Sequence, residues 1–97
     1  MHTIRFSWNE GKNRVNQRKH GVAFEEAKTV FYDERAIEFA DPDHSAREDR
    51  FLMLGLSERL RMVLVCHCFR ENDAVIRIIS ARKATRRERE RYGRGIP

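Results

Sequence analysis

Residues 61–82 read RMVLVCHCFRENDAVIRIISAR, two long apolar and β-branched runs on either side of one short polar link. The runs cover residues 61–70 and 74–82, and each is typical of a β-strand. A link this short predicts an antiparallel hairpin rather than a crossover connection. Two more strands are predicted upstream, over residues 35–41 and 49–57, with a turn at Asp41-Pro42-Asp43 after the first.

Helices are predicted on both sides of this meander. A short strand over residues 3–8 precedes Asn9, which can cap a helix that ends with Lys19, His20 and Gly21. Residues 23–32 carry apolar side chains at helical spacing, and residues 84–92 form a strongly charged helical pattern. The order β-α-α-β-β-β-β-α predicts an α+β fold. At 97 residues, we expect it to form one domain, residues 1–97, with the sheet packed against the N-terminal helices and a basic helix at the C-terminus.

Two arginines in the last predicted strand need an explanation. Arg77 lies inside the apolar run and Arg82 lies at its end. Burying an unpaired charge is costly, so each arginine has either a carboxylate partner or an anionic ligand from outside. Pairing of Arg77 with Glu38 or Glu48 across the strands is the structural alternative.

Strict alternation assigns side chains to the two faces of the sheet. It predicts that the helices cover an apolar face made of Leu52, Leu54, Leu64, Cys66, Ile76 and Ile78. His67, Arg77 and Arg61 are then expected on the opposite face, and Arg82 at its rim. A sheet surface with such groups suits RNA, whose phosphates bind cations.

The net charge of +5 is concentrated in one region. From Arg82 onward there are seven basic residues and two acidic ones, so this segment accounts for the whole net charge. Such a patch indicates a phosphate-rich or acidic partner, although a solvated helix face would have the same composition. The sequence has no apolar run long enough for a membrane span and no signal-peptide core, and we expect a cytoplasmic location without membrane contact.

Three blocks of sequence resemble the signature of the BrnT family of bacterial toxins. They are K-x-x-x-N-x-x-K-H-G-V-x-F-x-E-A-x-x-V-F over residues 12–31, D-H-S-x-x-E-x-R over 43–50, and R-I-I-S-A-R-x-A-x-x-x-E-R-x-x-Y over 77–92. Two departures are visible. Asn9 stands where an Asp is common, and Cys66 and Cys68 flank His67 in place of plainer residues.

The resemblance implies a type II toxin–antitoxin toxin with a RelE-like fold and ribonuclease activity. It also implies a BrnA-type antitoxin, a ribbon-helix-helix protein, as partner. Operator DNA would be bound only through the toxin–antitoxin complex, which represses its own operon. Arg77 and Arg82 match the family motif firmly, Glu48, Arg50 and His67 less so, and Lys19 and His20 weakly.

RNA cleavage without a metal needs a base for the 2′-hydroxyl, cations for the charge on phosphorus, and an acid for the leaving oxygen. We assign Arg77 and Arg82 to the phosphate because the guanidinium fork suits it. His67 is the candidate for proton transfer, since imidazole titrates near neutral pH, and Glu48 is the alternative base. The expected RNA-binding residues share a positive charge: Arg50, Arg61, Arg70, Lys83, Arg86, Arg87 and Arg89.

Other assignments are considered beside this one. His20 is interpreted as a helix-capping residue and His44 as a surface or structural residue. Cys66 and Cys68 are interpreted as buried thiols, because alternation points His67 away from both sulfurs; no metal and no cofactor are expected. The rival functions are a basic module that binds RNA or protein without cleavage, and a weakened toxin that serves only in operon repression.

Overall fold

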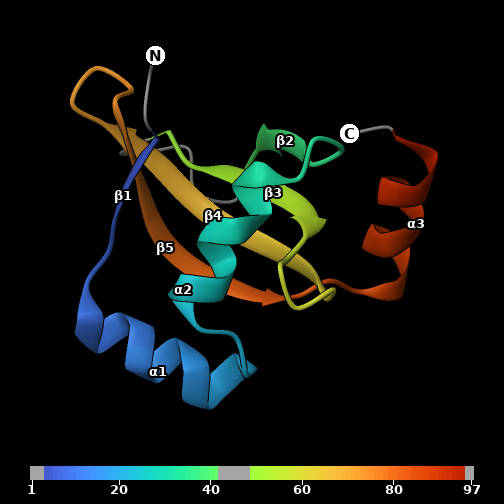
Figure 1. The fold of residues 1–97 in the computed structure, drawn as a ribbon, viewed down its shortest axis with the longest axis horizontal. Coiled ribbons are helices and arrows are strands. Elements are labelled where there is room, and N and C mark those ends of the chain that lie inside the picture. Colours follow the sequence, from blue (N-terminus) through green and yellow to red (C-terminus); the bar gives the residue numbers. More distant parts are fainter. Residues whose placement is uncertain (1–3, 42–48, 96–97) are drawn as a thin grey trace.

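A computed structural model describes residues 4–41 and 49–95 of the chain (Figure 1). A five-stranded sheet has the order β1-β5-β4-β3-β2, with β1 parallel to β5 and the other pairs antiparallel. The helical segments are α1 (Glu10–His20), α2 (Phe24–Ala27), which continues as the 3-10 helix η1 (Lys28–Tyr32), and α3 (Arg86–Arg94). The strands are β1 (Arg5–Ser7), β2 (Ile37–Ala40), β3 (Phe51–Leu56), β4 (Met62–Arg70) and β5 (Val75–Lys83). The predicted α+β class and the predicted order of elements are confirmed.

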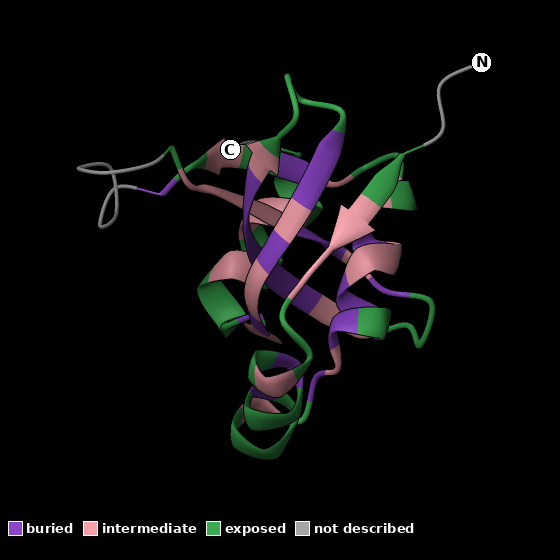
Figure 2. Cartoon of the chain, turned by 90° about the vertical axis from the view of Figure 1, so that its left-hand side faces the viewer, coloured by how far each residue is buried: buried purple, intermediate pink, exposed green. Residues whose placement is uncertain are grey.

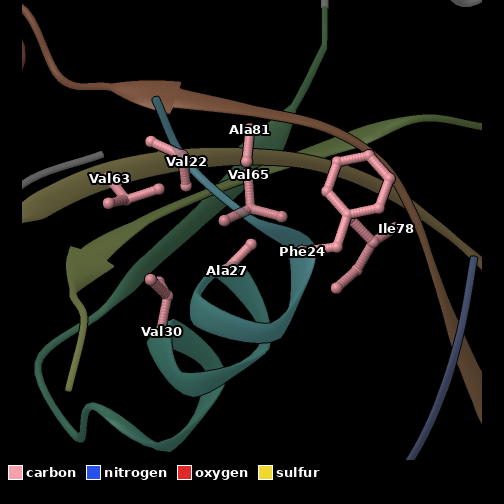
Figure 3. Packing of buried hydrophobic residues seen from close by; sticks show 8 residues of the cluster. All are labelled: Val22, Phe24, Ala27, Val30, Val63, Val65, Ile78 and Ala81. Atoms are coloured by element: carbon pink, nitrogen blue, oxygen red, sulfur yellow. The ribbon is translucent and has the colours of Figure 1, made fainter. Parts of the chain in front are cut away.

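The main core lies between α2, η1 and one face of the sheet (Figure 3). Phe24, Ala27 and Val30 present one apolar side of α2 and η1 to the strands, and all three are fully buried. Opposite them lie side chains of β4 and β5: Val63, Val65, Ile78 and Ala81. A side chain at Gly55 on β3 would come within 2.9 Å of Val30 and Ala36, so this glycine allows η1 to pack closely on the sheet.

A β-bulge changes the register of the central hairpin. Near its loop, Arg70 pairs with Val75 and Cys68 pairs with Arg77, so even-numbered residues of β4 share a face with odd-numbered residues of β5. Beyond the shift between Cys66 and His67, Cys66 pairs with Ser80 and Leu64 pairs with Arg82, so even-numbered residues of both strands share a face. Ile79 is the extra residue that the partner strand does not match.

The predicted assignment of faces is therefore wrong for β3 and β4. The helix-covered face contains Val63, Val65, His67, Ile76, Ile78 and Ala81. The outer face contains Leu52, Leu64, Cys66, Arg77, Ser80 and Arg82. The prediction assumed that even-numbered residues of the two strands share a face throughout. The four-residue loop instead pairs even-numbered residues of β4 with odd-numbered residues of β5, and the bulge then shifts the pairing by one more residue. The bulge thereby brings Arg77 and Arg82 to one face, although the sequence gives them opposite parity.

The helix α3 covers part of the outer face at the end away from β1 (Figure 1). Ala84, Leu54 and Leu64 form a small buried cluster there, and Tyr92 of α3 packs against it. The Tyr92 hydroxyl donates a hydrogen bond of 2.6 Å to Asp33 Oδ2, and the Arg91 guanidinium lies 4.6 Å from the centre of the Phe39 ring. No residue of α3 is itself buried, so the helix is held to the sheet by these few side chains.

Among the described residues, no helix has the length and apolar character required to cross a membrane.

Candidate active site

A pocket of about 440 Å³ opens on the outer face, between α1 and the uncovered part of the sheet. Its floor is apolar, with Leu52 of β3 and Leu64 of β4. Polar and ionisable groups stand around this floor. They are His20, Asp41, Arg50, Cys66, Ser80 and Arg82. The pocket therefore combines three cationic or cationisable side chains with one carboxylate, Asp41.

Arg82 has a carboxylate partner within the fold. Its Nη1 and Nη2 atoms donate to Glu88 Oε1 and Oε2, each at 2.9 Å, which is the two-pronged geometry of guanidinium with an oxyanion. These hydrogen bonds raise the pKa of Arg82 and lower that of Glu88. The Arg82 side chain is still 40% exposed, so a ligand in the pocket can reach it.

The position of His20 follows from how α1 ends. Gly21 takes the left-handed conformation (φ 71°) and its N–H donates to the Gln17 carbonyl at 2.8 Å, which terminates the helix. His20 is the last residue before this cap, and its imidazole lines the pocket together with Arg82. The sequence-based interpretation of His20 as a capping residue is thus correct for its place at the end of α1, and its side chain also lines the pocket.

Asn16 fixes α1 against the exposed edge of β5. Its amide nitrogen donates to the Val22 and Ala81 carbonyls at 2.8 and 2.9 Å, and its Oδ1 accepts from the Ala81 N–H at 3.1 Å. Ala81 lies beyond Arg77, the last β5 residue that β1 pairs, so Asn16 satisfies a strand edge that has no neighbouring strand there. Asn16 precedes His20 by one helical turn, and Ala81 precedes Arg82 by one residue. The same three hydrogen bonds therefore set the spacing of His20 and Arg82.

Cys66 is a poor nucleophile in this setting. Burial, followed by the nearby Asp41 carboxylate, raises its pKa to about 11. The thiol is therefore protonated at neutral pH, while the nucleophilic form of cysteine is the thiolate. Cys66 and Cys68 are both buried and neither forms a disulfide, in agreement with the interpretation as buried thiols.

His67 lies on the other side of the sheet from this pocket, and its predicted position on an exposed face is wrong. Its side chain is 0% exposed and packs edge-on against Phe31 and Phe69, with ring centres 4.8 and 5.5 Å away. Its Nδ1 lies 3.1 Å from the Val65 carbonyl and its Nε2 lies 3.0 Å from Glu38 Oε2. The cause is the hairpin register, which pairs His67 with Ile78 on the helix-covered face.

Arg61 is also on the helix-covered side, so its expected place on the opposite face is wrong. Its Nε donates to Glu26 Oε2 at 2.9 Å, its Nη2 donates to Glu26 Oε1, and a further bond of 3.0 Å reaches the Gly21 carbonyl. Glu26 is buried and accepts another hydrogen bond of 2.7 Å from Ser57. Arg61 thus ties α2 to the start of β4, and its donors are largely occupied.

Arg77 shares the outer face with Arg82 but lies outside the pocket. Their partners on β4, Cys68 and Leu64, are four residues apart, which corresponds to about 13 Å along the strand. The Arg77 guanidinium forms no hydrogen bond or ion pair with another residue within 4–41 and 49–95. Its suggested partner Glu38 instead contacts His67. This spacing favours contacts of the two arginines with two different phosphates.

The remaining predicted residues lie around the pocket or outside the described ranges. Arg50 lines the pocket, whereas Arg70 lines a separate hollow near the hairpin loop with Asp49, Phe69 and Asp73. On α3, Arg86 contacts Glu90 at 3.5 Å and Arg89 donates to the Ala84 carbonyl at 3.0 Å. Arg87 and Lys83 are exposed. Glu48 and His44 lie outside the described residues.

Sequence reasoning missed the proximity of His20 to the arginines, which depends on long-range contacts. The available signal was the pair Asn16 and His20, one turn apart on a helix with little apolar character. Within the described part of the chain, no group of three or more His, Cys, Asp and Glu side chains is placed to hold a metal ion.

Comparisons with known proteins concern the family and the fold of the chain. The family model described as the ribonuclease toxin BrnT of type II toxin–antitoxin systems matches residues 8–88. The chain is also similar to the crystal structure of the Brucella abortus ribonuclease toxin BrnT, with a TM-score of 0.67 and 23% identity over 87% of this chain and 100% of that one. At this identity the likeness shows the fold. No curated protein sequence matches the chain.

Proposed function

Because this chain belongs to the BrnT family of ribonuclease toxins of type II toxin–antitoxin systems, we propose that it cleaves RNA in the pocket of His20, Arg50 and Arg82, without a metal ion. One observation carries this proposal. A group able to transfer a proton and two guanidinium groups line the same open pocket over an apolar floor. These residue types can serve proton transfer and stabilisation of phosphoryl charge.

In this reaction the ribose 2′-oxygen attacks the adjacent phosphorus and the bond from phosphorus to the 5′-oxygen breaks. The products are a 2′,3′-cyclic phosphate and a 5′-hydroxyl. His20 transfers one of the two protons, because an imidazole nitrogen can accept or donate a proton. Arg82 and Arg50 stabilise the extra negative charge on the phosphoryl oxygens.

The second proton-transfer group is Glu48 in this proposal. It lies outside the described residues, two positions before Arg50 in the sequence. We do not retain His67 in the pocket chemistry, because its ring is fully buried on the helix-covered face. Arg77 binds a phosphate other than the one that reacts, since it lies about 13 Å along the strand from Arg82.

Substrate binding has an internal competitor in Glu88. The two Glu88 oxygens occupy the guanidinium fork of Arg82 as two phosphoryl oxygens would. A phosphate therefore either displaces this carboxylate or binds the remaining exposed edge of the guanidinium. The same pairing supports the second candidate function, a non-cleaving or weakened protein that binds RNA or protein only, because a purely structural ion pair would have this geometry.

The partner is proposed from family membership. A BrnA-type ribbon-helix-helix antitoxin neutralises the toxin in the cytoplasm, and the complex binds operator DNA through the antitoxin. The exposed arginines of α3, above all Arg86 and Arg87, offer an electrostatic surface for an acidic antitoxin segment.

The test is cleavage of a mixed-sequence RNA by purified protein in the presence of EDTA. We expect cleavage with cyclic-phosphate and 5′-hydroxyl ends, and a loss of about 10² to 10⁴ in rate for His20→Ala with an unchanged melting temperature. His2→Ala is the matched histidine control. Folded wild-type protein that binds RNA but leaves it intact would favour the non-cleaving module, and full activity of His20→Ala would remove His20 from the mechanism.

A further inference from the structure

A second hollow lies beside the pocket, between α1 and β5. It has a volume of about 590 Å³ and is open to solvent. Val15 of α1 and Ile79 of β5 provide its apolar part, and Lys12 and Lys19 are at its rim. His20 and Ser80 line both this hollow and the pocket, so the two form one continuous groove across β5.

The apolar part of the groove is not used by the core. The buried residues of α1 are Asn13 and Asn16, which attach the helix by hydrogen bonds rather than by an apolar face. The Asn13 Oδ1 accepts a hydrogen bond of 2.8 Å from the Phe24 N–H, and its Nδ2 donates one of 2.9 Å to Glu25 Oε1. Val15, the only apolar side chain of α1, is 53% exposed, and Figure 2 shows how much of this helix faces solvent. The fold therefore leaves an apolar side chain facing an open groove.

Ile79 reaches the same groove because of the bulge. It is the unmatched residue of β5, and it is only partly buried although its neighbours Ile78 and Ala81 are in the core. Bulges commonly redirect one side chain next to an active site. Here the redirected side chain lines the same hollow as Val15 of the helix, so the apolar lining comes from two separate elements.

The rim of the groove is cationic. Lys12 and Lys19 precede and follow Val15 by three and four residues, so all three side chains share one side of α1. No acidic side chain lines this part of the groove among the described residues. The ammonium group of neither lysine forms an ion pair or hydrogen bond with a residue of the described ranges. An apolar patch between two cations, continuous with a phosphate pocket, matches a base and its flanking phosphates.

We propose that this groove binds the nucleotide next to the scissile one, on the same RNA strand. The base or ribose packs on Val15 and Ile79, and the neighbouring phosphates contact Lys12 and Lys19. The side chains of Val15 and Ile79 have no hydrogen-bonding groups, so packing on them tolerates different bases. This inference deepens the proposed ribonuclease function, and it concerns RNA binding rather than the cleavage step.

The test measures binding of fluorescent 2′-O-methyl RNA, which lacks the attacking hydroxyl, at lengths of 2, 4, 8 and 12 nucleotides. Wild-type affinity should rise with length. In the double variant Lys12→Ala/Lys19→Ala the affinity for 8 and 12 nucleotides should fall roughly tenfold, with little change for 2 nucleotides. The slope of log affinity against log salt should also decrease by about 1.4, the value for two single-strand phosphate contacts. Val15→Asp should weaken binding of the longer RNAs as well.

The matched control is Arg14→Ala/Arg18→Ala, which removes the same charge from α1 at exposed positions outside the groove. If both double variants lose affinity equally, the effect is general charge and the groove assignment is wrong. Groove variants that bind RNA normally but lose affinity for purified antitoxin would overturn RNA as the occupant. Length-dependent binding by a wild-type protein that does not cleave unmodified RNA would contradict the proposed enzyme while supporting the groove.

Discussion

On the helix-covered face of the sheet, the buried ionisable side chains Glu26 and His67 have partners inside the fold. Glu26 is held by Arg61 and Ser57, and His67 lies against Glu38 and Val65. On the outer face, the carboxylate partner of Arg82 is Glu88, which belongs to a helix without buried residues. The polar groups of the helix-covered face bind one another and stabilise the fold. On the outer face, Arg82 remains accessible to a ligand above an apolar pocket floor.

The largest difference between the faces should appear in stability. Phe24→Ala removes a fully buried ring that packs edge-on against Trp8 at 6.1 Å, and should lower the free energy of unfolding by about 3–5 kcal/mol. Val15→Ala, in the open groove, should change it by less than about 0.5 kcal/mol. Urea unfolding of both variants measures this contrast. Equal losses would mean that Val15 belongs to the core.

The next difference should appear in catalysis. Arg82→Ala should reduce the rate of RNA cleavage by about 10² to 10³, the loss expected when one preorganised donor to a developing oxyanion is removed. Arg82→Lys keeps the charge but loses the fork, and should recover only part of the rate. Arg14→Ala, an exposed arginine on α1 that lines neither the pocket nor the groove, is the control and should retain activity. A loss of activity that only follows a fall in melting temperature would make the Arg82–Glu88 pair structural.

The smallest effect concerns pH. Hydrogen bonds from Arg82, and further ones from Thr85, hold the pKa of Glu88 below its usual value, and those from Arg61 do the same for Glu26. A carboxyl whose pKa is lower in the folded state stabilises the fold above its unfolded pKa. This contribution is lost as the pH falls through the folded pKa. Stability should therefore decrease on acidification below about pH 5.

Glu88→Gln should remove part of this dependence and cost less than about 1 kcal/mol at pH 7, since the pair is partly solvated. Melting temperatures between pH 3 and 7 for wild type and Glu88→Gln provide the measurement. A wild-type curve that rises on acidification, or an unchanged slope in the variant, would contradict the assignment of this stabilisation to Glu88.

Much of the fold could be predicted from the sequence because its signals are local. Asn9, Gly21 and the apolar spacing of residues 24–31 define helix ends and faces within a few residues. The site could be predicted only in part. Arg82 and Arg50 were identified by type and motif, but the exclusion of His67 and the inclusion of His20 depend on strand register. That register is set by a loop length and a bulge, neither of which alters the hydrophobic pattern of either strand.

The bulge at Ile79 makes the length of β5 as important as its composition. Removing this one residue would restore strict alternation along β5, so Arg77 and Arg82 would then be four positions apart and would stay on the outer face. Inserting one more residue into the strand would instead reverse the side chains on one side of the insertion, unless a second bulge formed. If residues 75–78 were reversed, the Arg77 guanidinium would enter the helix-covered layer, and Ile76 and Ile78 would face water. Protein engineers who graft this hairpin can therefore shorten β5 at Ile79 but should not lengthen it.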